Sequence, residues 1–209
     1  LTYSMFITAQ CDFGKEPLFL RSRGVRDVGA RNLDTVLHIN EDDCVFSCMM
    51  NLAGYTSPFA CMTAQYDAFA EACTLAGDAA EDARLVEGGD GAQINFYEKI
   101  CVHATASARC SGGTVDRRRQ RVLVGLVRDT VTVSSPVDCI TACVDAAGQL
   151  PYRCRSVAYY YGERTRNCAL SDSSAASHPR SLADEHGVVV DYFGVDECHG
   201  IREIRNGAS

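Results

Sequence analysis

The sequence predicts an α+β protein made of two similar halves, each with one short helix among several strands. Twelve of the 209 residues are cysteine, and they fall into two sets of six whose successive spacings match, at 33, 4, 13, 12 and 28 residues and then 29, 4, 11, 14 and 30. This position-by-position agreement indicates an internal repeat of about 90 residues. The first set is Cys11, Cys44, Cys48, Cys61, Cys73 and Cys101, and the second is Cys110, Cys139, Cys143, Cys154, Cys168 and Cys198.

Six cysteines in each repeat favour disulfides and an oxidising compartment. The competing interpretation is zinc binding, which usually places cysteines two residues apart or close to histidine. The sequence contains no C-x2-C pair, and His38, His103, His178, His186 and His199 do not stand at ligand spacing from the cysteines. Because each repeat can bury only a small core, three bridges worth about 2–4 kcal/mol each would contribute much of its stability.

Each repeat has one predicted helix, which begins just before its pair of cysteines four residues apart. Asn40 and Ser135 are typical helix caps, and Pro136 suits the first helical position. The spacing places both thiols of each pair on one helix face, where they can bond to neighbouring strands. We expect Gly54 and Gly148 to end the two helices.

The other apolar stretches of the first repeat are predicted strands. We expect strands at residues 17–21, 28–31, 35–39, 59–66, 73–75 and 93–101. The stretch 77–92 is polar, acidic and rich in glycine, which predicts a solvated loop. Residues 102–109 are mostly small and predict a short linker between the two repeats.

The second repeat follows the same order. We expect strands at residues 122–126, 131–133, 152–161, 167–171 and 187–193, a polar loop at 173–185, and an exposed tail at 199–209. Strict alternation would place Cys154 on the face opposite Val157 and Tyr159, which are core candidates. A bulge after Cys154, or a strand that begins after this cysteine, would reconcile the two expectations.

Charge and hydropathy exclude some classes of function. The net charge is −7. Residues 1–101 carry 7 basic and 15 acidic side chains, whereas residues 102–209 carry 13 and 12. No broad basic field exists, so we expect no nucleic-acid partner. No apolar run reaches membrane-spanning length. We expect a mature or excised part of a secreted protein, located outside the cell in the matrix or at the cell surface.

This arrangement resembles the PAN/apple domain family, in two copies that cover nearly the whole chain. The residues that carry the resemblance are the helical C-x3-C pairs and, in the second half, Cys154-Arg155-Ser156-Val157-Ala158-Tyr159 followed by Cys168-Ala169-Leu170-Ser171. The first half is more divergent, with Cys61-Met62-Thr63-Ala64-Gln65-Tyr66 and then Cys73-Thr74-Leu75. Its closing Phe96-Tyr97-Glu98-Lys99-Ile100-Cys101 is similar to the terminal strand of PAN domains in zona-pellucida-type apical matrix proteins.

The resemblance implies the fold and the disulfide pairing. Each domain would be a curved antiparallel sheet wrapped around one helix, with domains at residues 8–102 and 109–199. The implied pairs are first with sixth, second with fifth and third with fourth. These are Cys11–Cys101, Cys44–Cys73, Cys48–Cys61, Cys110–Cys198, Cys139–Cys168 and Cys143–Cys154. The sequence by itself leaves fifteen pairings open for each set of six.

No catalytic pattern is evident. The sequence has no G-x-S-x-G nucleophile elbow and no C-x-x-C redox motif. We expect a protein that is not an enzyme and that needs no metal or other cofactor.

Two groups of side chains are candidates for binding. Arg117, Arg118, Arg119 and Arg121 form a basic cluster that suits a sulfated glycan or an acidic partner, and that also fits a minimal protease site. Arg153 and Arg155, with Tyr159 and Tyr161, form a second cluster of the residue types favoured at binding surfaces. For both groups the simpler interpretation is a solvated surface, and part of the tyrosine set should belong to the core.

The hypothesis is a secreted recognition module that contacts proteins or carbohydrates within a larger extracellular protein. The family resemblance leaves three alternatives, which are a carbohydrate-binding apple-domain lectin, the accessory region of a secreted protease, and an inert spacer. Self-association is a further contact that the sequence leaves open.

Overall fold

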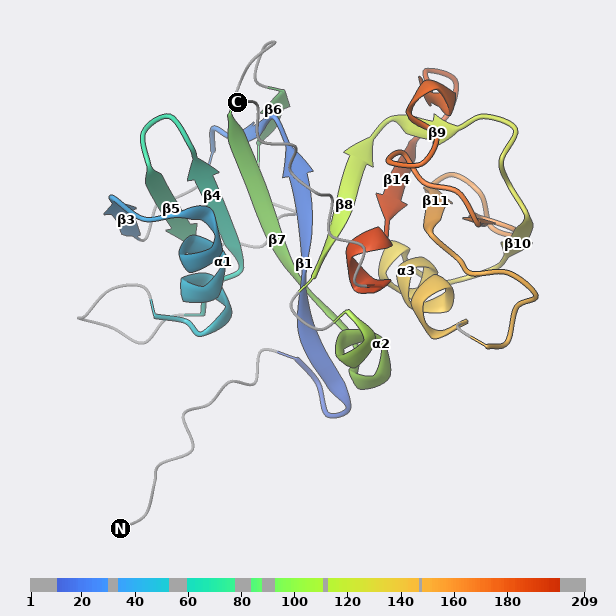
Figure 1. Cartoon of the computed structure of the whole chain (residues 1–209), viewed down its shortest axis with the longest axis horizontal. Helices are drawn as coiled ribbons and strands as arrows, with labels where there is room; N and C mark the ends of the chain where they lie inside the picture. The colour runs from blue at the N-terminus through green and yellow to red at the C-terminus, as the bar shows by residue number, and fades with distance from the viewer. Residues whose placement is uncertain are drawn as a thin grey trace. The chain divides into compact units, whose positions relative to one another are not determined.

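The computed structural model describes residues 11–29, 34–52, 60–77, 84–87, 93–110, 113–146 and 148–199. Of His199 it describes only the backbone. The chain divides into two compact units, Leu1–Cys101 and Val102–Ser209 (Figure 1). The expected domain limits, 8–102 and 109–199, remain a proposal. Residues 1–10 and the expected tail beyond His199 lie outside the described residues.

Unit 1 contains a five-stranded sheet with one helix packed on it. Its strands are ordered β1-β7-β4-β5-β3, and α1 packs against β4 and β5. A separate antiparallel pair is formed by β2 and β6. The bounds are β1 Lys15–Arg23, β2 Val25–Asp27, β3 Asp34–Leu37, α1 Glu41–Met49, β4 Thr63–Asp67, β5 Ala72–Ala76, β6 Leu85–Glu87 and β7 Ile94–His103.

Unit 2 repeats this architecture. Its strands are ordered β8-β14-β11-β12-β10, α3 packs against β11 and β12, and β9 pairs with β13. The bounds are α2 Ala104–Arg109, β8 Thr114–Arg119, β9 Arg121–Leu123, β10 Asp129–Val131, α3 Pro136–Asp145, β11 Ser156–Tyr160, β12 Cys168–Ser171, β13 Leu182–Asp184 and β14 Val190–Gly194, with 3-10 turns η2 Pro179–Ser181 and η3 Asp196–His199. The prediction of an α+β fold is confirmed.

The internal repeat extends to the pairing register of the strands. In unit 1, Tyr66 on β4 lies opposite Cys73 on one side and Asn95 on the other. In unit 2, Tyr159 on β11 lies opposite Cys168 and Asp191. The two tyrosines therefore occupy equivalent places, and so do Asn95 and Asp191. Because a slip of one residue would move every side chain to the other face, this agreement reflects one common fold rather than similar composition.

Both helices begin as predicted. The side chain of Asn40 accepts a hydrogen bond from Asp43 N at 2.8 Å, and that of Ser135 accepts one from Asp138 N at 3.1 Å. The predicted end of the first helix is wrong, because α1 stops at Met49. There Asn51 takes the left-handed conformation, with φ of 53°, and Asn51 N donates to Cys48 O. Asparagine thus fills the role expected of glycine, while Gly54 lies outside the described residues.

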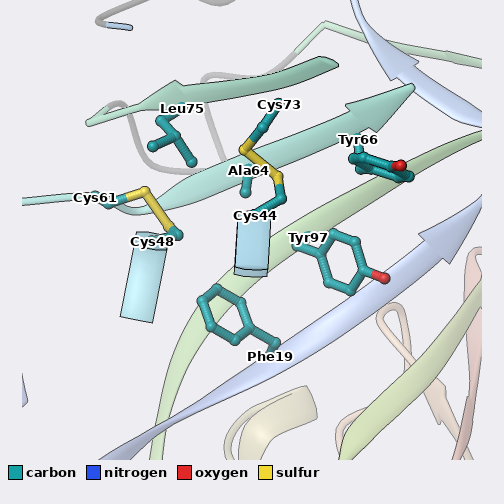
Figure 2. Packing of buried hydrophobic residues seen from close by; sticks show 9 residues of the cluster. All are labelled: Phe19, Cys44, Cys48, Cys61, Ala64, Tyr66, Cys73, Leu75 and Tyr97. Atoms are coloured by element: carbon teal, nitrogen blue, oxygen red, sulfur yellow. A yellow bond between two sulfur atoms is a disulfide. The ribbon is translucent and has the colours of Figure 1, made fainter. Parts of the chain in front are cut away.

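All twelve cysteines are paired, in six disulfides that join the same partners as the family resemblance implied. Figure 2 shows the two bridges that leave α1 toward the strands of unit 1, Cys44–Cys73 and Cys48–Cys61. They lie in a buried cluster with Phe19, Ala64, Tyr66, Leu75 and Tyr97. The bridges are therefore part of the core that fixes α1 on the sheet.

The expected linker at residues 102–109 is wrong. Strand β7 continues to His103, and α2 follows directly. Helix α2 packs on α3, where Ala106 is buried, Thr105 Oγ1 donates to the Asp145 carboxylate at 3.0 Å, and Arg109 donates to Val144 O at 2.9 Å. Small residues suited a linker in the sequence, but they also allow close helix packing.

Several expected strand limits also need correction. The strand expected at 28–31 lies earlier, at Val25–Asp27, and that expected at 59–66 begins only at Thr63. Cys154 precedes β11, which begins at Ser156, so the second of the two reconciling explanations holds. The expected polar loop at 173–185 contains the short strand β13 and two buried serines, Ser173 and Ser174.

Candidate functional site

The predicted binding residues lie on three elements of unit 2. Strand β8 carries three arginines of the basic cluster, and Arg121 opens β9. The second group comes from the approach to β11 and from β11 itself. It consists of Arg153, Arg155, Tyr159 and, directly after the strand, Tyr161.

Asp191 on β14 brings members of both groups together. Its Oδ2 accepts hydrogen bonds from Arg117 Nε at 2.9 Å and from a terminal guanidinium nitrogen of Arg117 at 2.6 Å, and from Tyr161 OH at 2.9 Å. The side chain of Asp191 is 6% exposed and that of Arg117 is 18% exposed. A carboxylate this deeply buried is stable as an ion only with such partners.

The strand register places further side chains on the same sheet face as Asp191. Arg119 and Tyr159 lie directly opposite Asp191 on the two neighbouring strands. The rings of Tyr159 and Tyr161 meet edge to face, with centroids 4.9 Å apart. The guanidinium of Arg117 lies 6.0 Å from the centre of the Phe193 ring, at the outer limit of a cation–π contact.

One edge of this group is open to solvent. Tyr161 N donates to Val189 O at 3.0 Å, so the two side chains are neighbours, and they are 42% and 62% exposed. We call Arg117, Arg119, Tyr159, Tyr161, Val189 and Asp191 the Asp191 patch. It combines an exposed aromatic ring, an exposed aliphatic side chain and a fixed charge pair.

Sequence reasoning missed Asp191 and Val189 as members of the site. The available signal was an aspartate inside the otherwise apolar run Val188-Val189-Val190-Asp191-Tyr192-Phe193. A charge at such a position requires a partner of opposite charge nearby in the fold.

The remaining arginines of the predicted groups lie elsewhere and are paired. Arg118 binds Asp116 at 2.9 Å, and Arg121 binds Asp184 at 2.9 Å. Arg155 binds Asp196 at 2.7 Å, and Arg153 is exposed ahead of β11. The predicted basic cluster is therefore largely neutralised by carboxylates, of which Asp116 lies next to it in the sequence and Asp184 and Asp191 lie far from it.

Gln120, which lies between Arg119 and Arg121 in the sequence, anchors the turn between β8 and β9. Its φ is 52°. Its side-chain amide donates to Glu185 O and Val188 O and accepts from Val190 N, and its backbone N donates to Val190 O. These hydrogen bonds fix the backbone of the turn. A protease that must bind its substrate as an extended segment would therefore not find one here.

Unit 1 has a different polar centre at the equivalent position. Glu41, at the start of α1, accepts hydrogen bonds from Asn95 Nδ2 at 2.5 Å and from Tyr97 OH at 2.7 Å. Burial raises the pKa of Tyr97, and the neighbouring Glu41 raises it further. Here the negative charge comes from the helix rather than from the strand, so the two units present different chemistry from the same scaffold.

Among the described residues, no group of three or more His, Cys, Asp or Glu side chains is placed to hold a metal ion. No helix in that part of the chain is long and apolar enough to span a membrane.

The fold and the Asp191 patch define a disulfide-stabilised α+β module with a surface suited to binding. The family model described as the PAN domain matches residues 110–198, which lie in unit 2. PAN domains are a type of module that binds proteins or carbohydrates. The solved structure of the two N-terminal apple domains of Toxoplasma gondii microneme protein 4 is similar at 13% identity and a TM-score of 0.28, over 81% of this chain and 85% of that one. A search of curated proteins found no match.

Proposed function

We propose that both units are PAN/apple domains and that the chain is an extracellular, non-catalytic recognition module within a larger secreted or matrix protein. The observation that carries the proposal is the PAN match to residues 110–198, because unit 1 repeats the strand register and the disulfide pattern of that matched region. The six disulfides support an oxidising, extracellular location. The closing strand of unit 1 favours a zona-pellucida-type apical matrix protein as the parent.

We place the recognition surface at the Asp191 patch. Exposed aromatic and aliphatic side chains beside arginine are typical of protein-binding surfaces, and the ion pair below them holds Tyr161 in position. The pairing of Arg117, Arg118 and Arg121 with carboxylates argues against a sulfated chain as the main ligand. A protein partner therefore fits the surface better than a polyanion does.

The test compares binding of the whole chain to arrayed extracellular proteins and to a glycan array that includes sulfated glycosaminoglycans, each at two salt concentrations. The informative variant is Val189→Ser, which removes exposed apolar surface without altering the ion pair. A matched control is Val124→Ser, because Val124 is 61% exposed in the same unit but lies after β9, outside the patch.

The proposal expects binding to a protein that Val189→Ser weakens about tenfold and that Val124→Ser leaves unchanged. Salt-resistant binding to one neutral sugar would assign the lectin function instead. Binding only to sulfated chains, lost at high salt, would assign matrix tethering through the arginines. Binding to nothing in either array would favour a spacer or the accessory region of a protease.

A further inference from the structure

The six disulfides differ in how far the protein encloses them. All twelve cysteines belong to the described residues, and ten of them, the members of five bridges, are at most 3% exposed. The remaining bridge, Cys11–Cys101, joins two cysteines that are both partly exposed. Exposed disulfides are reduced more easily than enclosed ones, because a thiolate must reach a sulfur atom to attack it. Cys11–Cys101 is therefore the bridge that a reductant can reach in the folded chain.

The equivalent bridge of unit 2 is enclosed by local structure. Cys198 lies in the 3-10 turn η3, and Cys110 N donates to Ala106 O at the end of α2. The side chain of Glu197, next to Cys198, accepts hydrogen bonds from Thr114 N at 3.2 Å and from Thr114 Oγ1 at 2.7 Å. These contacts hold η3 against the start of β8, and Cys110 and Cys198 are only 1% and 3% exposed.

In unit 1 the corresponding cysteines lie in more open surroundings. Cys101 is part of the extended strand β7 rather than of a turn. His103 lies two residues further along β7, on the same face of the strand, and is exposed. Cys11 is followed by a turn in which residues 12–14 are all exposed. The two units therefore enclose the same bridge to different extents, because the sixth cysteine lies in a strand in one unit and in a turn in the other.

Opening Cys11–Cys101 would leave the core of unit 1 cross-linked. The other two bridges of this unit, Cys44–Cys73 and Cys48–Cys61, belong to the buried cluster that fixes α1 on the sheet, and Cys11–Cys101 lies outside that cluster. Strand β1 follows Cys11, strand β7 contains Cys101, and the two strands are neighbours in the sheet. The freed thiols would therefore stay close enough to re-form the bridge once the reductant is removed.

We propose that Cys11–Cys101 is a site of thiol–disulfide exchange, which a thiol reductant opens and an oxidising environment closes while the other five bridges stay intact. The reductant is a small thiol such as glutathione or a dithiol protein of the thioredoxin type, because both supply the thiolate that the attack needs. The exchange site does not involve the Asp191 patch, whose residues all belong to unit 2.

The exchange consists of two displacements. A thiolate of the reductant attacks one sulfur of the bridge and forms a mixed disulfide, and the other cysteine leaves as a thiolate that takes a proton from water. A second thiolate of the reductant then attacks the reductant's own sulfur in the mixed disulfide and releases the second cysteine, which is protonated in the same way. The bridge gains two electrons and two protons, and the two thiols of the reductant become one disulfide.

Timed reduction of the whole oxidised chain tests the proposal. The chain is incubated without denaturant, with reduced glutathione in one arm and with a thioredoxin-type dithiol protein in the other. Free thiols are alkylated at intervals, and the labelled cysteines are identified by mass spectrometry. We expect Cys11 and Cys101 to be labelled at least about tenfold faster than any of the other ten cysteines. Selective labelling in both arms shows that a small thiol suffices, and selective labelling in the second arm alone assigns the dithiol protein as the reductant.

Two controls separate access from intrinsic reactivity. In the chain unfolded by guanidinium, glutathione should open all six bridges at similar rates, because the fold no longer shields any of them. In the double variant Cys11→Ala with Cys101→Ala, the other ten cysteines should stay unlabelled over the time in which the unaltered chain opens its exposed bridge. The proposal is overturned if another bridge of the folded chain opens first, if all six open together, if the ten cysteines of the double variant are labelled, or if neither arm opens Cys11–Cys101 in the time that glutathione takes to open it in the unfolded chain.

Discussion

The ion pair between Arg117 and Asp191 should be worth far more than an exposed ion pair of the same geometry. Asp191→Asn removes the charge but keeps the shape, and it leaves the guanidinium of Arg117 buried without its carboxylate. Removing one partner of a buried pair typically costs about 3–5 kcal/mol. Because the side chain of Arg117 retains 18% exposure, we expect the lower end of this range, about 3 kcal/mol.

The matched control is Asp172→Asn. Arg128 donates to Asp172 at 2.7 Å, a distance similar to those in the Asp191 pair, but the two side chains are 60% and 26% exposed. Exposed pairs contribute about 0.2–1 kcal/mol. The two substitutions therefore make the same chemical change at two depths of burial.

Native-state hydrogen exchange is the appropriate assay, because a chain with two units need not unfold in one step. Peptides from β11 and β14 report on unit 2, and peptides from β4 serve as an internal control. A double-mutant cycle with Arg117→Met should give a coupling of about 2 kcal/mol. The reasoning is refuted if Asp191→Asn costs no more than Asp172→Asn, or if the two single changes simply add.

Three further changes have defined outcomes. Burial lowers the pKa of Lys99 from 10.5 to about 8, so the unfolded chain binds a proton there that the folded chain releases. The free energy of unfolding of unit 1 should therefore rise by about 2 kcal/mol between pH 8 and about pH 10, and Lys99→Met should abolish the rise in hydrogen-exchange or denaturant measurements; a flat profile in the unaltered chain would contradict this. At Gly194 an added Cβ would lie 3.0 Å from Tyr192 OH, which accepts a hydrogen bond from Ala175 N. Gly194→Ala should cost about 1–3 kcal/mol of unit 2 stability, and a neutral result would disprove the close approach. Replacing both Cys48 and Cys61 by alanine opens a loop whose ends are 13 residues apart and should cost about 3 kcal/mol in denaturant unfolding; an unchanged midpoint would argue against the bridge.

The features that the sequence predicted correctly are those coded by local pattern. The helix starts follow from Asn40 and Ser135, whose side chains cap the nearest backbone amides. The repeat follows from the cysteine spacings. A capping residue lies within a few residues of the helix start that it specifies, and the cysteines recur at a fixed period. Both signals can therefore be recognised in the sequence before the fold is known.

The features that were missed depend on contacts between distant segments. Asp191 lies 74 residues from Arg117 in the sequence, and only the register of β8, β11 and β14 brings these two and Tyr161 together. The sequence predicts a free positive surface at the basic cluster, because the carboxylates that pair with Arg117 and Arg121 follow much later, at Asp191 and Asp184. The sequence predicts a linker where α2 lies, because a segment of small residues this short forms a stable helix only when it packs against another element, here α3.

Disulfide mapping tests the central claim, that the chain is two copies of one disulfide-stabilised domain. The intact protein is digested under non-reducing conditions at mildly acidic pH, which suppresses exchange, and the linked peptides are identified by mass spectrometry. The account predicts six linked pairs, each within one unit and each in the order first with sixth, second with fifth and third with fourth. A free thiol, a bridge between the units or a different order in either unit would contradict it.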